Sequence, residues 1–126
     1  MEAAGENSFE ATRVNVLGTL NLLEESFRQG RERFVHASSS VVYGKQKLPI
    51  TEEAPLKPIN TYGASKLAGE ALVNTYREEK EPSSIAPRYF NVYDPGMHGG
   101  PYAGVIYKFI NSALRNKPLI TYGNGE

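Results

Sequence analysis

A tyrosine and a lysine four residues apart are the side chains in this sequence best suited to acid–base chemistry. They lie at the two ends of the stretch Tyr62-Gly63-Ala64-Ser65-Lys66. Residues at positions i and i+4 of an α-helix share one face of that helix. An ammonium group beside a phenol lowers the phenol's pKa from its ordinary value of about 10, toward the range of a general base. The spacing therefore predicts a catalytic Tyr–Lys pair, although it also recurs by chance on helix surfaces.

Three helices and three strands alternate along the predicted chain, which indicates an α/β fold with a doubly wound parallel sheet covered by helices on both faces. Helices are predicted from near Phe9 to Gly30, from Thr61 to Glu79 and from Gly104 to Asn116. Strands are predicted over residues 33–38, 84–93 and 119–122. In the first helix, the apolar residues at helical spacing are Phe9, Val14, Leu17, Leu20, Leu23 and Phe27. In the third, the residues expected to face inward are Val105, Phe109 and Leu114.

Polar residues follow the predicted strands. Ligands of parallel sheets bind at the carboxyl ends of the strands, and Ser38–Ser40, Tyr62 and Asn91 are expected to meet at that edge. Residues 45–59 contain three prolines and are predicted to form a long connection without regular structure. Pro87 lies inside the second predicted strand, where it removes a ladder hydrogen bond. A turn is predicted at Asp94-Pro95-Gly96.

Composition limits the kinds of partner. The 126 residues suit one domain, and 14 basic residues balance 14 acidic ones, so no basic excess exists for nucleic-acid binding. The sequence has no cysteine, and its two histidines, His36 and His98, lack ligand-like spacing with carboxylates. No apolar run approaches membrane-spanning length. We therefore expect no metal site, no nucleic-acid or membrane partner, and a cytoplasmic protein.

Five segments of the sequence resemble the extended short-chain dehydrogenase/reductase family. They are NVLGT at 15–19, FVHASSSVVYG at 34–44, YGASK at 62–66, RYFNVY at 88–93 and ITYGNG at 120–125. Their order and spacing also match, and the resemblance covers nearly the whole chain. Within the family, the chain is most similar to the nucleotide-sugar epimerases and dehydratases, and among these to the UDP-glucose 4-epimerases. The resemblance implies a Rossmann-like fold, NAD as cofactor and a UDP-hexose as substrate.

The resemblance also implies a role for individual residues. Tyr62 would be the base that removes the proton of the sugar 4-hydroxyl, Lys66 would lower the pKa of Tyr62 and hydrogen-bond the nicotinamide ribose, and Ser39 would bridge the sugar hydroxyl and Tyr62. The implied cofactor-binding residues are Ala37, Ser38, Ser39, Tyr62, Lys66 and Phe90. The implied substrate-binding residues are Ser39, Tyr62, Asn91 near the diphosphate, and Val105, Ile106, Ile120, Thr121 and Tyr122 along the uridine pocket.

In this family the reaction implied is hydride transfer from sugar C4 to NAD, followed by return of the hydride to the other face of a 4-keto intermediate. The dehydratase branch resembles the pattern STDEVYG at the serine motif, where an Asp–Glu pair performs the elimination. Ser40 and Val41 occupy those two places here and cannot exchange protons in that way. The resemblance therefore favours an epimerase over a dehydratase, and a related nucleotide-sugar dehydratase or decarboxylase stays an alternative.

One family motif, the glycine-rich phosphate-binding loop, does not occur in the sequence. The chain is therefore interpreted as a middle fragment. Residues 1–93 would be the C-terminal half of an NAD-binding domain, and residues 94–126 would begin a substrate-binding region. The alternative to an active epimerase is a truncated, non-catalytic product, and the isolated chain is expected to bind NAD very weakly and to turn over nothing. A full-length relative is expected to be a homodimer, with the first two helices at the interface.

Overall fold

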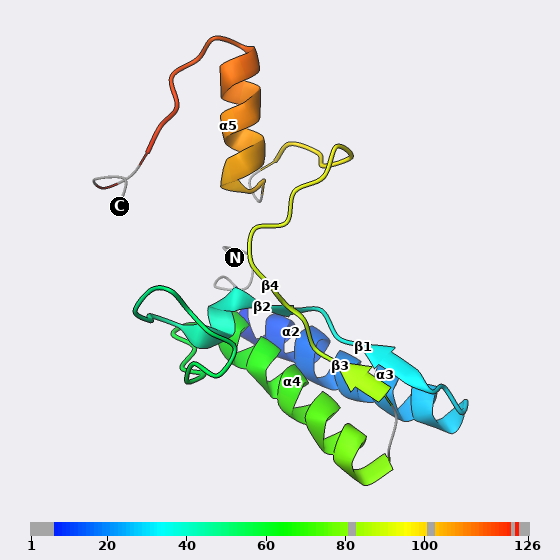
Figure 1. Cartoon of the computed structure of the whole chain (residues 1–126). Coiled ribbons are helices and arrows are strands. Elements are labelled where there is room, and N and C mark those ends of the chain that lie inside the picture. The colour runs from blue at the N-terminus through cyan, green and yellow to red at the C-terminus, as the bar shows by residue number, and fades with distance from the viewer. Residues whose placement is uncertain (1–6, 81–82, 101–102, 122, 124–126) are drawn as a thin grey trace. The chain divides into compact units, whose positions relative to one another are not determined.

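The computed structural model describes residues 7–80, 83–100, 103–121 and 123. The chain divides into two compact units, Met1–Phe90 and Asn91–Glu126. The elements of the first unit are α2 (Ser8–Thr12), the π-helix η1 (Arg13–Leu17), α3 (Gly18–Arg28), β1 (Arg33–Val35), β2 (Ser38–Ser39), the 3-10 helix η2 (Ser40–Tyr43), α4 (Thr61–Lys80), β3 (Ser83–Ile85) and β4 (Arg88–Tyr89) (Figure 1). The second unit contains α5 (Val105–Leu114).

The first predicted helix begins and ends close to where it was expected, at Ser8 and Arg28, but a π-helical turn interrupts it. The side chain of Asn7 caps it by accepting from the amide of Glu10 at 3.0 Å. η1 then separates α2 from α3, and a π-turn rotates the residues after it relative to those before it. The predicted apolar stripe is consequently not one buried face, since Leu23 is 2% exposed whereas Phe9 is 79% exposed.

Each of the first two predicted strands is two short strands in the structure, and the second ends at Tyr89 rather than at Tyr93. β1 pairs in parallel with β3, and β2 pairs in parallel with β4, in two separate two-stranded sheets. The interruption in the second strand falls at Ala86 and Pro87, because proline has no amide hydrogen to donate to the ladder. Backbone hydrogen bonds still bridge the gap, from His36 to the Ile85 carbonyl at 2.9 Å and from Ser38 to the Pro87 carbonyl at 3.0 Å.

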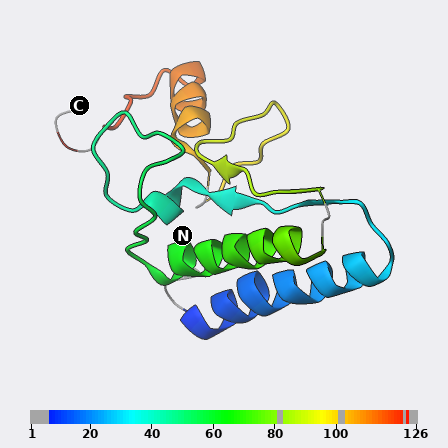
Figure 2. The same cartoon turned by 60° about the horizontal axis from the view of Figure 1, so that its bottom comes forward.

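Helix α4 packs against the strands, and the α2–α3 run packs against α4 (Figure 2). The apolar core of this arrangement consists of Leu23, Val42, Tyr43 and Val73. The other face of the strands was expected to carry helices as well, but Val35 and Ile85 are exposed by 65% and 61%. The described helices of this unit thus leave the side of the strands that carries Val35 and Ile85 uncovered, and α4 is the helix that packs against β2 and β3.

The approach of α4 to the strand segment is close at Gly69. A Cβ atom placed on Gly69 would lie 2.7 Å from Nε2 of His36, so this position has no room for a side chain. His36 itself is buried, and among the described residues its Nε2 has no hydrogen-bond partner. Burial lowers the pKa of His36, and the nearby charge of Lys66 lowers it further, while the charge of Glu70 and a hydrogen bond with the backbone of Lys66 act in the other direction.

The chain is expected to lose stability as the pH falls below 6.5, the ordinary pKa of histidine. The unfolded chain binds the proton of His36 more tightly, so the free energy of unfolding decreases from that pH down to the lowered pKa of the folded state. Replacing His36 by glutamine should flatten the pH dependence of Tm between neutral pH and about pH 5. The matched control, His98→Gln, alters an exposed histidine and should leave the profile unchanged. An unaltered profile in His36→Gln would contradict the prediction.

The second unit is built around α5. The predicted turn before it is confirmed by a hydrogen bond from the Met97 amide to the Asp94 carbonyl at 3.0 Å. The inward orientation predicted for Val105 and Leu114 is wrong, since they are exposed by 46% and 79%, whereas Phe109 is half-buried. A helix in so small a unit has little chain available to cover its apolar residues.

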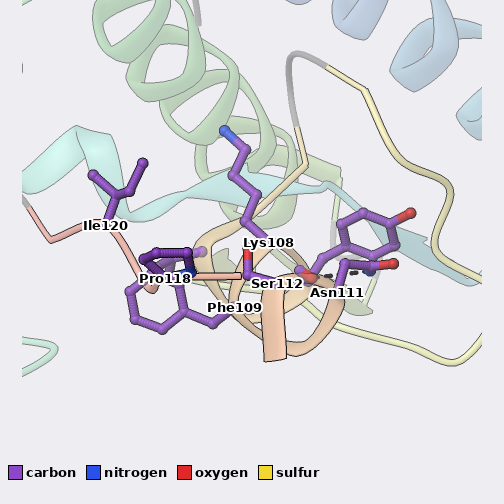
Figure 3. A pocket seen from close by; sticks show the side chains of 8 residues that line it. Lys108, Phe109, Asn111, Ser112, Pro118 and Ile120 are labelled. Carbon is purple, nitrogen blue, oxygen red and sulfur yellow. Dashed lines mark hydrogen bonds between the residues drawn. The ribbon is translucent and has the colours of Figure 1, made fainter. Parts of the chain in front are cut away.

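The last predicted strand, over residues 119–122, is also corrected by the structure. Leu119–Thr121 have no regular secondary structure, and Tyr122 lies outside the described residues. A β-strand requires a partner strand, and the described part of the second unit contains none. The segment instead forms one wall of a cavity of about 550 Å³ beside α5 (Figure 3). Its lining residues are Val105, Tyr107, Lys108, Phe109, Asn111, Ser112, Pro118 and Ile120.

Two further features are lacking from the described ranges. No helix within them is both long and apolar enough to cross a lipid bilayer. They also contain no group of three or more histidine, cysteine, aspartate or glutamate residues arranged to hold a metal ion.

Candidate active site

Tyr62 and Lys66 lie on the first two turns of α4. The Nζ atom of Lys66 is 5.8 Å from the centre of the Tyr62 ring and donates a 3.0 Å hydrogen bond to the carbonyl oxygen of Ala37. Lys66 is half-buried, and this burial lowers its pKa from the ordinary value of 10.5. The lysine is therefore near the tyrosine ring and is bonded to the segment that leads into β2.

The serine segment lies against the start of the same helix. Ser39 closes β2 and caps η2, its Oγ accepting from the Val41 amide at 3.5 Å. A Cβ atom placed on Gly63 would lie 2.9 Å from the carbonyl oxygen of Val41, so the backbone of α4 approaches η2 closely beside Tyr62. The structure thus brings the segment with Ser38 and Ser39 to the helix face with Tyr62 and Lys66.

A chain of hydrogen bonds connects the π-turn η1 to Tyr62. The side-chain amide of Asn15 donates to Ser65 Oγ at 3.0 Å, and Ser65 Oγ donates to the Tyr62 carbonyl at 2.8 Å. The carbonyl of Asn15 accepts from Thr19 Oγ1 at 2.7 Å. Asn15 therefore joins the first helical run to the turn of α4 that carries Tyr62 and Ser65.

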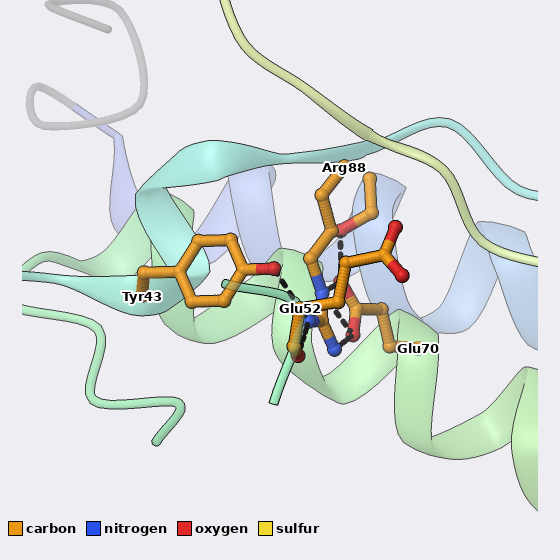
Figure 4. Close-up of polar contacts among 5 residues, drawn as sticks. Tyr43, Glu52, Glu70 and Arg88 are labelled. Atoms are coloured by element: carbon orange, nitrogen blue, oxygen red, sulfur yellow. Dashed lines mark hydrogen bonds and ion pairs between the residues drawn. The ribbon is translucent and has the colours of Figure 1, made fainter. Parts of the chain in front are cut away.

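A buried charged cluster beside the serines was not predicted from the sequence (Figure 4). Glu70 accepts a hydrogen bond from Ser38 Oγ at 2.5 Å and forms an ion pair with Arg88 at 2.8 Å. Arg88 also donates to the hydroxyl of Tyr43 at 2.9 Å, and its guanidinium lies 4.9 Å from the centre of that ring. The hydrogen bonds with Glu70 raise the pKa of Arg88, so the guanidinium remains charged. The sequence offered one indication of this cluster: Glu70 follows Lys66 by four residues, so it lies on the same face of the helix as Lys66 and Tyr62.

The other predicted cofactor contact, Phe90, belongs to the first unit. Its ring centre is 6.3 Å from that of Tyr43, and the side chain is 60% exposed. Its surface is thus available to a ligand, and its suggested role in binding the cofactor stays a prediction. Tyr43 is buried and joins Phe90 to the charged cluster.

Most of the predicted substrate-binding residues lie in the second unit: Asn91, Val105, Ile106, Ile120 and Thr121. Val105 and Ile120 line the same cavity of about 550 Å³. Ile106 instead lines a different cavity of about 340 Å³, together with Tyr93, Met97 and Ile110. The structure therefore brings two of the predicted residues together and directs a third to another surface of α5. Tyr122 lies outside the described residues.

The residues present fit the nicotinamide end of NAD. The ammonium of Lys66 carries three N–H donors, and one of them is used by the Ala37 carbonyl. A half-buried ammonium with donors to spare at a strand end is suited to binding ribose hydroxyls. The glycine-rich loop that would hold the phosphates is not part of this sequence.

Comparison with known proteins gives a consistent family. The model of the NAD dependent epimerase/dehydratase family matches residues 2–126. UDP-N-acetyl-alpha-D-glucosaminuronate decarboxylase of Bacillus cytotoxicus is 38% identical over 127 residues, which cover 96% of this chain and 39% of the relative. UDP-glucose 4-epimerase of Mycolicibacterium smegmatis is 38% identical over 122 residues, which cover 94% of this chain and 38% of the relative.

A solved structure with a similar fold is UDP-N-acetylglucosamine 4-epimerase of Methanobrevibacter ruminantium in complex with UDP-N-acetylmuramic acid. It is 29% identical, with a TM-score of 0.88, over 99% of this chain and 41% of that chain. The chain therefore spans about two-fifths of the length of the relatives it matches. The likeness confirms the predicted Rossmann-like α/β fold, and the matched family uses NAD, as predicted. Dehydratases are also among the relatives.

Proposed function

The chain belongs to the NAD dependent epimerase/dehydratase family, and we propose that it is the middle part of a nucleotide-sugar 4-epimerase. The substrate proposed is a UDP-hexose of the UDP-glucose/UDP-galactose type. The observation that carries the proposal is the position of Lys66, whose ammonium lies 5.8 Å from the centre of the Tyr62 ring and 3.0 Å from the Ala37 carbonyl oxygen. That arrangement supplies a phenol, an ammonium and a strand-end serine in one region, which suits the oxidation of a sugar hydroxyl.

Each of these side chains has one task in the proposed reaction. Tyr62 takes the proton of the sugar 4-hydroxyl, and Ser39 orients that hydroxyl. Lys66, tied to Ala37 at 3.0 Å, stabilises the charge that develops on the phenolic oxygen. When bound, NAD supplies the redox chemistry that converts the sugar to its 4-keto form and back. Because proton transfer at Tyr62 is reversible, the same residue serves both half-reactions.

The serine motif favours epimerisation over dehydration. Ser40 and Val41 are the first two residues of η2, where the dehydratase pattern would require a carboxylate pair. Neither side chain can act as the acid or base of an elimination. A decarboxylase remains the second candidate, because a relative with that name is 38% identical. The two activities differ in substrate, since decarboxylation needs a uronate.

We further propose that the second unit receives the nucleotide. Its cavity of about 550 Å³ combines apolar walls, from Val105, Pro118 and Ile120, with the polar side chains of Asn111 and Ser112. A pocket with apolar walls and a few polar groups is typical of small-ligand sites. The size is within the usual range of such pockets. A pyrimidine ring with its attached ribose is the part of the substrate that these walls suit.

A homodimer is proposed for the complete enzyme. Apolar side chains on the first helical run are exposed by more than half of their surface, namely Phe9, Val14, Leu17 and Leu22. Exposed apolar side chains along one continuous helical run indicate an interaction surface. A second copy of the same surface would bury them symmetrically.

The function is tested by incubating the enzyme that contains this chain with NAD and one sugar nucleotide at a time. The four sugar nucleotides are UDP-galactose, UDP-glucose, UDP-N-acetylglucosamine and UDP-glucuronate. Proton NMR of the sugar region distinguishes a 4-epimer from a 4-keto-6-deoxy product or a pentose. Formation of a 4-epimer without loss of carbon dioxide supports the proposal. Release of carbon dioxide from UDP-glucuronate, with no epimer of any hexose, would replace it with the decarboxylase.

The isolated 126-residue chain is expected to bind NAD very weakly, because these residues supply no phosphate-binding loop. Calorimetric titration of the chain with NAD measures this. The UDP-glucuronic acid 4-epimerase of Bacillus cereus, solved in complex with NAD, serves as the positive control. A dissociation constant in the low-micromolar range for the chain would show that contacts other than the loop are sufficient.

A further inference from the structure

We propose that Glu70 and Arg88 are positioning residues: their buried ion pair holds the segment that carries Ser39 against the helix face that carries Tyr62 and Lys66. The inference rests on the proposed function, because it assigns these two residues a task in that same site. Neither residue was selected from the sequence, and neither is expected to touch the substrate. Their effect on the reaction passes through the residues that they hold.

The first step concerns one row of side chains on α4. Tyr62, Lys66 and Glu70 follow one another at intervals of four residues, so they lie on one face of the helix. Lys66 donates to the carbonyl of Ala37 at 3.0 Å, and Glu70 accepts from the hydroxyl of Ser38 at 2.5 Å. Lys66 and Glu70, on consecutive turns of α4, thus hold Ala37 and Ser38, the two residues immediately before Ser39.

The second step concerns the charge on Glu70. Its side chain is only 4% exposed, and a carboxylate so deeply buried is costly unless it is paired and hydrogen-bonded. Arg88 provides the partner through two nitrogens, with Nη2 at 2.8 Å from one oxygen and Nε at 3.0 Å from the other. This two-point contact restricts orientation as well as distance. Arg88 and Ser38 are also paired in register across β4 and β2.

The third step concerns the other end of the serine segment. The remaining nitrogen of Arg88, Nη1, donates to the Tyr43 hydroxyl at 2.9 Å and to the Glu52 carbonyl at 3.2 Å. One guanidinium therefore contacts Tyr43 directly and Ser38 through Glu70. Ser38 and Tyr43 bracket Ser39, whose own Oγ makes only a long 3.5 Å contact with the Val41 amide in the described structure. The placement of Ser39 consequently depends on the two ends that Arg88 and Glu70 hold.

Kinetics of the enzyme that contains this chain test the assignment. Arg88→Met should lower kcat by about 10²-fold, the cost of a small misplacement of catalytic groups, while KM for the UDP-hexose changes by less than about threefold. Arg88→Lys keeps the charge but loses the two-point contact, so its kcat should lie between those of Arg88→Met and the parent.

With substrate deuterated at C4, Arg88→Met should show a larger kinetic isotope effect on kcat than the parent, since hydride transfer then limits turnover. The matched control, Arg28→Met, removes an exposed ion pair with Glu25 and should leave kcat unchanged.

A double variant separates positioning from stability. Replacing both residues, as Glu70→Met with Arg88→Met, removes the buried charges together, a change that often restores stability. If this variant folds with the Tm of the parent and kcat stays low, the pair positions the site. If kcat also returns to the parent value, or if folded Arg88→Met retains the parent kcat and isotope effect, the proposal is wrong.

Hydrogen exchange on the 126-residue chain tests the same contacts without any turnover, so a failure of the proposed function does not affect it. Arg88→Met should accelerate exchange of the Ser38 and Gly44 amides by about tenfold or more. These amides donate to the carbonyls of Pro87 and Val41 at 3.0 and 3.2 Å. The His36 amide, bonded to the Ile85 carbonyl at 2.9 Å, is the internal reference. Equal acceleration at all three amides would overturn the assignment.

Discussion

Replacing Tyr62 with phenylalanine is expected to lower epimerisation by the complete enzyme about 10²–10⁴-fold, the usual contribution of a positioned acid–base group. The substitution removes only the phenolic oxygen, and the ring stays near Lys66, whose Nζ lies 5.8 Å from its centre. Affinity for the sugar nucleotide should therefore change little, because that oxygen acts mainly in the transition state. Turnover is measured by NMR, and affinity by calorimetric titration with the UDP-hexose.

The matched control is Tyr76→Phe on the same helix. The hydroxyl of Tyr76 donates to Glu24 on α3, which raises the pKa of Tyr76 to about 12, too high for a role in proton transfer at neutral pH. This variant should keep the parent turnover. Parent-like turnover in Tyr62→Phe itself would remove Tyr62 from the mechanism, and a large loss of affinity would show that Tyr62 contributes to binding rather than to chemistry.

Replacing Gly44 with alanine is expected to destabilise the chain by more than about 3 kcal/mol, from a left-handed backbone and a steric clash together. Gly44 ends the serine segment with a φ of 66° and a ψ of −144°. A Cβ atom there would lie 1.9 Å from the carbonyl oxygen of Lys57, a backbone atom that cannot move without shifting the 45–59 connection. Urea denaturation of the variant and the parent measures the difference in free energy of unfolding.

A second glycine separates the two causes. Gly30 has a similar φ of 64°, but a Cβ atom there would meet nothing within 4 Å. Gly30→Ala should therefore cost only the conformational penalty, about 1–2 kcal/mol. If the two variants lose equal stability, the contact with Lys57 is not important, and the connection adjusts more easily than the structure indicates.

Features that depend on neighbouring residues were predictable from the sequence. Periodicity predicted where the first helical run starts and the extent of α4, and turn-forming residues predicted the turn at Asp94, because these features depend on contacts within a few positions. Pro87 predicted the loss of a ladder hydrogen bond, and the strand is interrupted there. The apolar positions of α5 were predicted less well. Burial of Val105 and Leu114 would require another layer, and periodicity alone does not reveal whether one is present.

The charged cluster shows why part of the site could not be predicted. Its contacts join residues 32, 18 and 45 positions apart, from Ser38 to Glu70, from Glu70 to Arg88 and from Arg88 to Tyr43. A buried Glu–Arg pair has no short sequence pattern, because its partners come from different elements. From the sequence alone, a glutamate in a helix and an arginine in a strand are most simply interpreted as surface residues.

The sequence by itself determined that Tyr62 and Lys66 share a face of one helix, since a separation of four residues matches the helical repeat. It also determined the family, through five short segments in a fixed order. Only the tertiary structure decided that Lys66 reaches Ala37, 29 positions away, and that Glu70 and Arg88 hold the serine segment beside it. The physical reason is that helical periodicity is a local property of the chain, whereas the pairing of a buried charge depends on which elements pack together.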